Sequence, residues 1–216
     1  QAIGCNYIFK DGSKQKVGTI GTIGCTSFFP SKNLGCYGDG GAIFTNNDEL
    51  AIKLRQTANH GQSRRYIHDR VGVNSRLDSI QAAILRIKLR HLDNYSFERN
   101  KVADYYDKAF RKSEKLKTPK RVTYSNHVFH QYTLQLNSVN RDDIIAFLLE
   151  KGVPAMIYYP IPLHMQDAYK DPRYKEEDFP VTEKLCKTVI SLPMQTELSE
   201  EQLKHITDSV LEFLNK

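Results

Sequence analysis

One loop constrains the fold of this chain more than any other part of it. Two short runs, at about 22–28 and 41–45, are rich in β-branched residues and glycine. Between them the stretch 26–41 holds a single lysine among two serines, an asparagine and four glycines. Glycine lets a backbone turn tightly and approach a ligand closely, and N–H and hydroxyl groups in such a loop can hold a phosphate. The stretch predicts a strand, a loop that presents Lys32, and a second strand.

Lys32 itself has two interpretations. A lysine held in a folded loop can act as a nucleophilic amine, whereas most lysines in Gly/Ser-rich turns are solvated charges. The loop is not a Walker A motif, because Lys32 follows no G-x-x-x-x-G. It is not G-x-G-x-x-G either, because its glycines come after the lysine. The residues of the loop alone leave both interpretations open.

Periodicity and capping residues organise the rest of the chain into alternating helices and strands. Helices are expected at about 48–59, from 75 in two stretches to about 111, and at 140–152, 180–187 and 199–216. Strands are expected at 130–136, 153–158 and 189–192. Capping boxes are expected at Ser75 with Asp78 and at Ser199 with Gln202. Four apolar residues recur at helical spacing as a core-facing stripe: Leu77, Ile80, Ile84 and Ile87.

Composition limits the classes of function. The chain has 216 residues, of which 40% are hydrophobic and 26% charged, as in globular proteins. No apolar run approaches the ~18 residues of a membrane span. Residues 51–121 carry eighteen Lys/Arg against seven Asp/Glu, which favours an anionic partner, either nucleic acid or a phosphate-bearing small molecule; solvated helix faces are the plain alternative. The four cysteines lack C-x-x-C or zinc spacing, as is typical of a reduced, cytoplasmic protein.

Several motifs keep the order and spacing of one protein family. They are QA at 1–2, SFFPSKNLG at 27–35, GDGG at 38–41, HG at 60–61, VGVNSRL at 71–77, QAA at 81–83, HVFHQY at 127–132 and YYPIPLH at 158–164. Over nearly the whole chain they resemble the DegT/StrS family of pyridoxal-phosphate-dependent nucleotide-sugar aminotransferases. Within that family the chain is most similar to the UDP-linked 3-keto-hexuronate aminotransferases of O-antigen biosynthesis.

The resemblance implies an α/β fold that is the C-terminal portion of a type I, aspartate-aminotransferase-like enzyme. Residues 1–75 would be the remainder of the cofactor-binding large domain, 76–115 connecting helices, and 116–216 a small α+β C-terminal domain. The aspartate that the family places three residues before Gln1, and the phosphate turn upstream of it, are not in the sequence. We therefore expect this chain by itself to bind the cofactor poorly and to turn over little or nothing.

The same resemblance assigns residues to the cofactor, pyridoxal 5'-phosphate. Lys32 would be the catalytic residue, joined to the cofactor aldehyde as an imine, so that the ring can accept the electrons of a broken C–H bond. Ser27 would hydrogen-bond the cofactor phosphate, and Gln1 would lie near the ring hydroxyl. Asn74 would reach the phosphate from the neighbouring subunit, so the active site would be shared across a homodimer. No residue is assigned to a metal.

Four residues are the candidates for binding substrate: Arg76, His60, Tyr159 and His164. Arg76 offers a planar fork suited to a carboxylate or a phosphate, and in a hexuronate enzyme it would read the sugar carboxylate. Each candidate also has a plain structural alternative. Arg76 would be a surface residue at a helix start, and His60 would meet the last carbonyls of a helix. Tyr159 and His164 would belong to an ordinary packed loop.

The leading hypothesis is cytoplasmic amino transfer, from a donor such as glutamate to a keto nucleotide sugar, with neither nucleic acid nor a membrane as partner. Sugar dehydratases of the same family are the nearer alternative, but they carry histidine where Lys32 stands. The other alternative is a non-catalytic basic module that binds nucleic acid through 51–121. The sequence leaves open the nucleotide, the sugar, the donor, and amination at C3 or C4.

Overall fold

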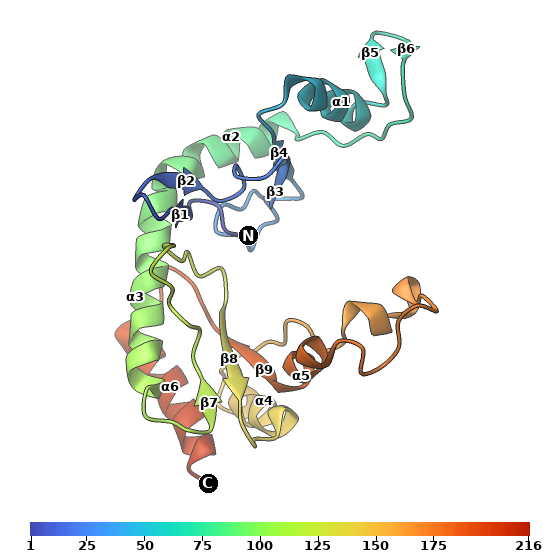
Figure 1. Ribbon diagram of the computed structural model, residues 1–216. Helices are drawn as coiled ribbons and strands as arrows, with labels where there is room; N and C mark the ends of the chain where they lie inside the picture. The colour runs from blue at the N-terminus through green and yellow to red at the C-terminus, as the bar shows by residue number, and fades with distance from the viewer. The chain divides into compact units, whose positions relative to one another are not determined.

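Residues 1–216 are described by a computed structural model and divide into two units, whose elements are labelled in Figure 1. The first unit comprises Gln1–Phe97 and Val122–His130, and the second comprises Glu98–Arg121 and Gln131–Lys216. No helix combines the length and the apolar character needed to cross a membrane. All four cysteines are free thiols. The division predicted from the sequence, at residues 75 and 115, concerns the domains of the family fold and stays a prediction.

Three two-stranded antiparallel ribbons form the strands of the first unit. They are β1 (Asn6–Ile8) with β2 (Lys14–Lys16), β3 (Gly24–Ser27) with β4 (Gly41–Phe44), and β5 (Gln62–Arg64) with β6 (Ile67–His68). In the middle ribbon Cys25 lies opposite Ile43, and Ser27 lies opposite Gly41. This pairing confirms the predicted strand–loop–strand unit around Lys32.

The first two α-helices of the first unit differ in how they begin. In α1 (Asp48–Ala58) the side chain of Asn47 accepts the N–H of Leu50 at 2.9 Å. The chain later runs through α2 (Ser79–Lys88) and η1 (Leu89–His91) into α3 (Leu92–Phe110). The capping box predicted at Ser75 is wrong, because α2 begins only after Asp78 and no side chain caps it. The N–H of Ser75 instead donates to the carbonyl of Ala58 at the end of α1 (2.9 Å), so the chain is still extended there.

A small apolar core joins α2 to the loop that carries Lys32. Its buried members are Phe28, Leu34, Cys36, Leu85 and Leu92, with Ile3, Ala42 and Leu77 packed against them. The predicted apolar stripe of α2 is therefore wrong at two positions, because Ile80 and Ile87 are 74% and 61% exposed. Leu85, which the stripe omitted, is the buried residue of α2. The core thus fixes the helix against the loop.

The second unit is built on a three-stranded antiparallel sheet in the order β7 (Leu116–Lys117), β8 (Tyr132–Leu136), β9 (Val189–Leu192). In β8 the residues Tyr132, Leu134 and Leu136 are buried and alternate with half-buried ones, as expected of a strand with one face in the core. The helices of this unit, besides the C-terminal part of α3, are α4 (Arg141–Glu150), α5 (Pro180–Thr188) and α6 (Glu200–Leu214). The predicted helices and strands here are confirmed, with one exception.

That exception is the strand predicted at 153–158, which forms only a single bridge. Met156 exchanges both backbone hydrogen bonds with Ser191, at 2.9 and 2.7 Å. The next antiparallel pair toward the start of the segment would join Pro154 to Pro193. Proline has no N–H to give to a ladder, so the pairing stops there. By contrast, the capping box of Ser199 and Gln202 is present as predicted.

Two buried tyrosines should make the second unit less stable at alkaline pH. Tyr106 and Tyr132 have no exposed surface, and their hydroxyls donate to the carbonyl of Pro193 (2.8 Å) and to a carboxylate oxygen of Asp107 (2.5 Å). Burial raises the pKa of both phenols well above the ordinary value, and Asp107 raises that of Tyr132 further. A raised folded pKa means that the contribution to stability is fully present below about pH 10 and is lost as the pH rises above it.

We expect the free energy of unfolding to fall above about pH 10, by up to about 1.4 kcal/mol per pH unit for each buried tyrosine. Urea unfolding at a series of alkaline pH values measures this slope. Tyr106→Phe should flatten it, whereas Tyr169→Phe, at a residue 62% exposed, should leave it unchanged. Equal slopes in the two variants would contradict the assignment.

Candidate functional site

Lys32 lies in the turn that opens the loop between β3 and β4. The N–H of Lys32 donates to the carbonyl of Phe29 at 2.9 Å, which closes a β-turn with Pro30 at its second position, where a fixed φ favours the turn. The next residue, Asn33, is buried, and its side-chain amide donates to the carbonyl of Val128 at 2.9 Å. Lys32 is half-buried, and these two hydrogen bonds fix the backbone around it. The sequence thus places one amine in a loop with a defined backbone.

Backbone hydrogen bonds also close the base of the loop. The N–H of Phe28 donates to the carbonyl of Gly40, and the N–H of Cys36 donates to the carbonyl of Phe28, both at 2.8 Å. Gly35 lies so close to the preceding turn that a Cβ there would come within 2.4 Å of the carbonyl oxygen of Pro30. Only glycine allows this approach. The loop is therefore a closed structure of fixed shape.

Two hydroxyls stand at the end of β3, just before the loop. Ser27 is half-buried, and its Oγ accepts the N–H of Phe29 at 3.2 Å. The Oγ1 of its neighbour Thr26 is buried and has no hydrogen-bond partner. Because neighbouring residues of a strand point to opposite faces, the two hydroxyls can bond groups on different sides of the ribbon, and the unpartnered one of Thr26 can bond a polar or anionic group on its own side. The sequence analysis missed Thr26, because nothing in its local pattern separates it from an ordinary strand residue. Gln1, another of the predicted cofactor residues, is exposed.

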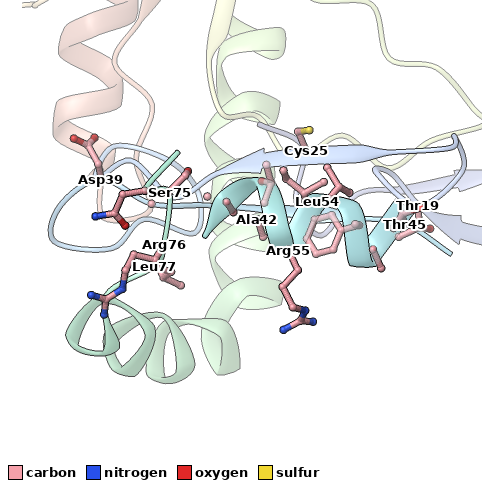
Figure 2. Close-up of a pocket in the computed structure, with 18 of the residues that line it drawn as sticks. Thr19, Cys25, Asp39, Ala42, Thr45, Leu54, Arg55, Ser75, Arg76 and Leu77 are labelled. Atoms are coloured by element: carbon pink, nitrogen blue, oxygen red, sulfur yellow. The ribbon is translucent and has the colours of Figure 1, made fainter. Parts of the chain in front are cut away.

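A cleft of about 1130 Å³ runs beside the β3–β4 ribbon (Figure 2). Its walls come from the ribbon, from α1 and from residues 74–78. The predicted residues Asn74 and Arg76 both line it, together with Thr26, Asp39 and Arg55. In Figure 2 the guanidinium groups of Arg55 and Arg76 extend to the same side. The structure thus brings Asn74 and Arg76 together beside the strands that carry the loop of Lys32.

Arg76 and His60 differ in how their side chains are placed. The guanidinium of Arg76 lies 3.6 Å from the carboxylate of Asp78, with both side chains more than two-thirds exposed, so this is a weak surface pair that leaves Arg76 able to bind an anion. His60 is exposed at a φ of 54°. Its backbone N–H donates to Val73 at 2.9 Å, and its carbonyl lies 2.8 Å from the Nδ1 of His68. His60 does not line the cleft, and its contacts hold the base of the β5–β6 ribbon.

The other two predicted substrate residues belong to the second unit. Tyr159 is 64% exposed and lines a cavity of about 980 Å³ on the α5 side of the sheet, together with Tyr158 and Lys117. His164 does not line this cavity. The Nε2 of His164 lies 3.2 Å from a carboxylate oxygen of Glu183, with both side chains nearly buried. The structure therefore places Tyr159 where it can meet a ligand, and places His164 in an internal pair.

Glu183 joins the loop after Tyr159 to α5. Its carboxylate accepts the backbone N–H of Glu177 at 2.9 and 3.1 Å and that of Phe179 at 3.4 Å, besides the contact with His164. Sequence analysis missed this role, because the partners of Glu183 are set by how the loop folds back. The carboxylate satisfies three donors that would otherwise lack an acceptor.

We expect Glu183→Ala to lower the free energy of unfolding by about 1–3 kcal/mol, because the partly buried hydrogen bonds that the carboxylate accepts are lost. Urea unfolding measures this loss. Glu183→Gln keeps an acceptor oxygen and should lose less. Lys184→Ala, at the exposed next position, should stay within about 0.5 kcal/mol of the wild type. An equal loss in Glu183→Ala and Lys184→Ala would show that the carboxylate does not hold the loop.

Comparison with known proteins gives consistent matches along the whole chain. Residues 1–211 match the DegT/DnrJ/EryC1/StrS aminotransferase family. The chain is 46% identical to a pleiotropic regulatory protein of Geobacillus stearothermophilus over 215 residues, which are 99% of this chain and 56% of that protein. It is 49% identical to the UDP-2-acetamido-2-deoxy-3-oxo-D-glucuronate aminotransferase of Pseudomonas aeruginosa over 187 residues, which are 87% of this chain and 50% of that enzyme.

The fold is similar to solved structures as well. The DesV protein of S. venezuelae, solved in complex with a ketimine intermediate, superposes with a TM-score of 0.90 at 34% identity, over 99% of this chain and 56% of that protein. The chain thus spans about half the length of the curated relatives it matches. These matches confirm the predicted fold class and the resemblance. The chain belongs to the DegT/DnrJ/EryC1/StrS aminotransferase family.

Proposed function

We propose that the protein transfers an amino group to the C3 keto group of a UDP-linked sugar, with pyridoxal 5'-phosphate as cofactor and an amino acid such as glutamate as donor. The observation that carries this proposal is the single lysine in a closed loop, in a chain of an aminotransferase family. The cleft with two arginines lies beside the strands that carry this loop and is not lined by Lys32. The relative named for a UDP-linked 3-oxo sugar acid supports the nucleotide and the C3 position. The product would be an amino sugar for surface polysaccharide.

The residues around the loop fit the cofactor. When bound, pyridoxal phosphate supplies a ring that accepts the electrons of a broken C–H bond. Lys32 would hold the cofactor at its aldehyde carbon, and its amine would be the group that moves a proton on the substrate. Ser27 contributes its hydroxyl to the phosphate. Gln1 would approach the ring hydroxyl, and Asn74 would complete the phosphate site of a second copy of the chain, so the protein would act as a cytoplasmic homodimer.

The remaining predicted residues serve the substrate. Arg76 is exposed at the cleft and offers a fork for a sugar carboxylate or for a phosphate of the nucleotide. Tyr159 offers an aromatic face and a hydroxyl to a ligand in the cavity that it lines within the second unit. His164 acts through the loop that Glu183 fixes, while His60 supports the segment that leads to Asn74. Of these, Arg76 makes the sharpest distinction between an acidic and a neutral sugar.

The test uses the protein expressed from its natural gene and loaded with pyridoxal phosphate. Addition of glutamate should convert the absorbance of the cofactor to that of pyridoxamine phosphate, and a UDP-linked 3-keto sugar acid should restore it. Mass spectrometry of the sugar should then show an amine in place of the keto oxygen. The matching dTDP-linked sugar tests the nucleotide. A product that has lost a hydroxyl without gaining nitrogen would indicate a dehydratase, and no change in cofactor absorbance would overturn the proposal.

A further inference from the structure

We propose that Lys88 and Gln81, two residues on one face of α2, are positioning residues that hold the backbone of the Lys32 loop. They are seven residues apart, which places them two turns from each other on the same side of a helix. Both are half-buried, and both contact the part of the loop that follows Lys32, residues 35–38. The inference rests on the proposed role of Lys32, and it names the groups that set where its amine stands.

Lys88 makes the stronger of the two contacts. Its ammonium donates to the carbonyl of Gly35 at 2.7 Å, and it lies 4.8 Å from the centre of the Tyr37 ring. A hydrogen bond from a charged donor is short and strong, and an ammonium over an aromatic face adds attraction. Both of these contacts of the Lys88 ammonium are therefore with the loop.

Gln81 holds the next part of the loop. Its Oε1 accepts the backbone N–H of Tyr37 at 2.8 Å. A Cβ at Gly38 would lie 3.0 Å from the Nε2 of the same side chain, so the loop lies directly against the amide. Lys88 and Gln81 together fix a carbonyl and an N–H only two residues apart, which determines both the position and the direction of this part of the backbone.

The hydrogen bonds of Lys88 and Gln81 affect the position of Lys32 because the two sides of the loop touch. Gly35 lies against the carbonyl of Pro30 with no room for a side chain, and Pro30 belongs to the turn that ends at Lys32. If Gly35 moves, Pro30 loses its contact with the backbone of Gly35, and the turn that contains Pro30 and Lys32 can shift. On the C-terminal side of Lys32, the hydrogen bond from Asn33 to Val128 does not involve α2. Loss of the contacts from α2 would thus loosen one side of the loop and leave the other in place.

The experiment compares Lys88→Met, which keeps the length of the side chain but removes the donor, with Lys88→Arg, which restores a donor. Arg86→Met is the matched control, because Arg86 is an exposed cation on the same helix. In the cofactor-free protein, we expect amide hydrogen exchange of residues 31–38 to rise about tenfold or more in Lys88→Met, the factor implied by loss of a hydrogen bond to a charged group. Lys88→Arg should recover most of the protection, and Arg86→Met should show none of the change.

With pyridoxal phosphate added, borohydride reduction and peptide mapping report how fast Lys32 attaches to the cofactor. We expect slower attachment in Lys88→Met, and a fall in kcat larger than the change in KM. Gln81→Leu should act in the same direction, and Gln81→Glu, which keeps the acceptor, should act less. Equal exchange in Lys88→Met and Arg86→Met would overturn the inference. Failure of the wild-type protein to attach the cofactor at Lys32 would instead overturn the proposed function, since the exchange measurement needs no cofactor.

Discussion

Replacing Lys32 with alanine is expected to abolish covalent attachment of pyridoxal phosphate and to lower kcat by about 10²–10⁴-fold, the range for loss of a positioned proton-transfer group. Lys32 is the only lysine of the β3–β4 loop, so no neighbour in the loop can replace its amine. The hydroxyl of Ser27 remains in this variant, so non-covalent binding of the cofactor should persist. The fall should therefore appear in kcat and in the borohydride-trapped product more than in the affinity for the cofactor.

Two variants separate this effect from a change in charge or in fold. Lys14→Ala removes an exposed lysine from the same unit and should leave activity and trapping unchanged. Lys32→Arg keeps a positive charge but offers no amine that forms an imine at neutral pH, so it should be as inactive as Lys32→Ala. Transamination by Lys32→Ala at a rate near that of the wild type would remove Lys32 from the mechanism, even if the protein is an aminotransferase.

Features set by neighbours in the sequence were predicted correctly. The helix expected from residue 48 and the capping box at Ser199 depend on residues within a few positions of one another. The two strands beside the Lys32 loop pair across the single loop that connects them. The cap at Ser75 was wrong, because its N–H is taken by Ala58, seventeen positions earlier in the chain. Local patterns state which bonds a residue can make, and long-range pairing decides which of them it makes.

In the candidate site, too, some residues could be found from the sequence and others only from the folded structure. Lys32, Asn74 and Arg76 were found through motifs of the family, and the structure lets two of them share a cleft. Thr26 and Glu183 were not found, because an unpartnered hydroxyl and a carboxylate that gathers backbone N–H groups become visible only once the surrounding chain is folded. The bonds of Lys88 and Gln81 to the loop were likewise hidden, since α2 lies about fifty residues from it in sequence.

Replacing Gly61 with alanine is expected to cause the largest loss of stability in the segment that presents Asn74. Gly61 has a φ of 75°, and an added Cβ would come within 1.7 Å of the carbonyl oxygen of Arg70. Its own carbonyl accepts the N–H of Asp69 at 3.0 Å, so the backbone cannot move away without opening the β5–β6 ribbon. Left-handed strain costs about 1–2 kcal/mol, and the collision should bring the total above about 3 kcal/mol, at the upper end of single substitutions.

Gly152 provides a matched control for this steric argument. Its φ of 74° is almost the same, but a Cβ there would meet nothing within 4 Å, so Gly152→Ala should cost only the strain. Gly12, at a φ of 84° with equally open surroundings, gives the same comparison within the first unit. Urea unfolding measures the three losses, and amide exchange of residues 59–74 should increase only in Gly61→Ala. Equal losses in Gly61→Ala and Gly152→Ala would mean that the contact with Arg70 does not shape the segment, and that Asn74 is held in place by α1 alone.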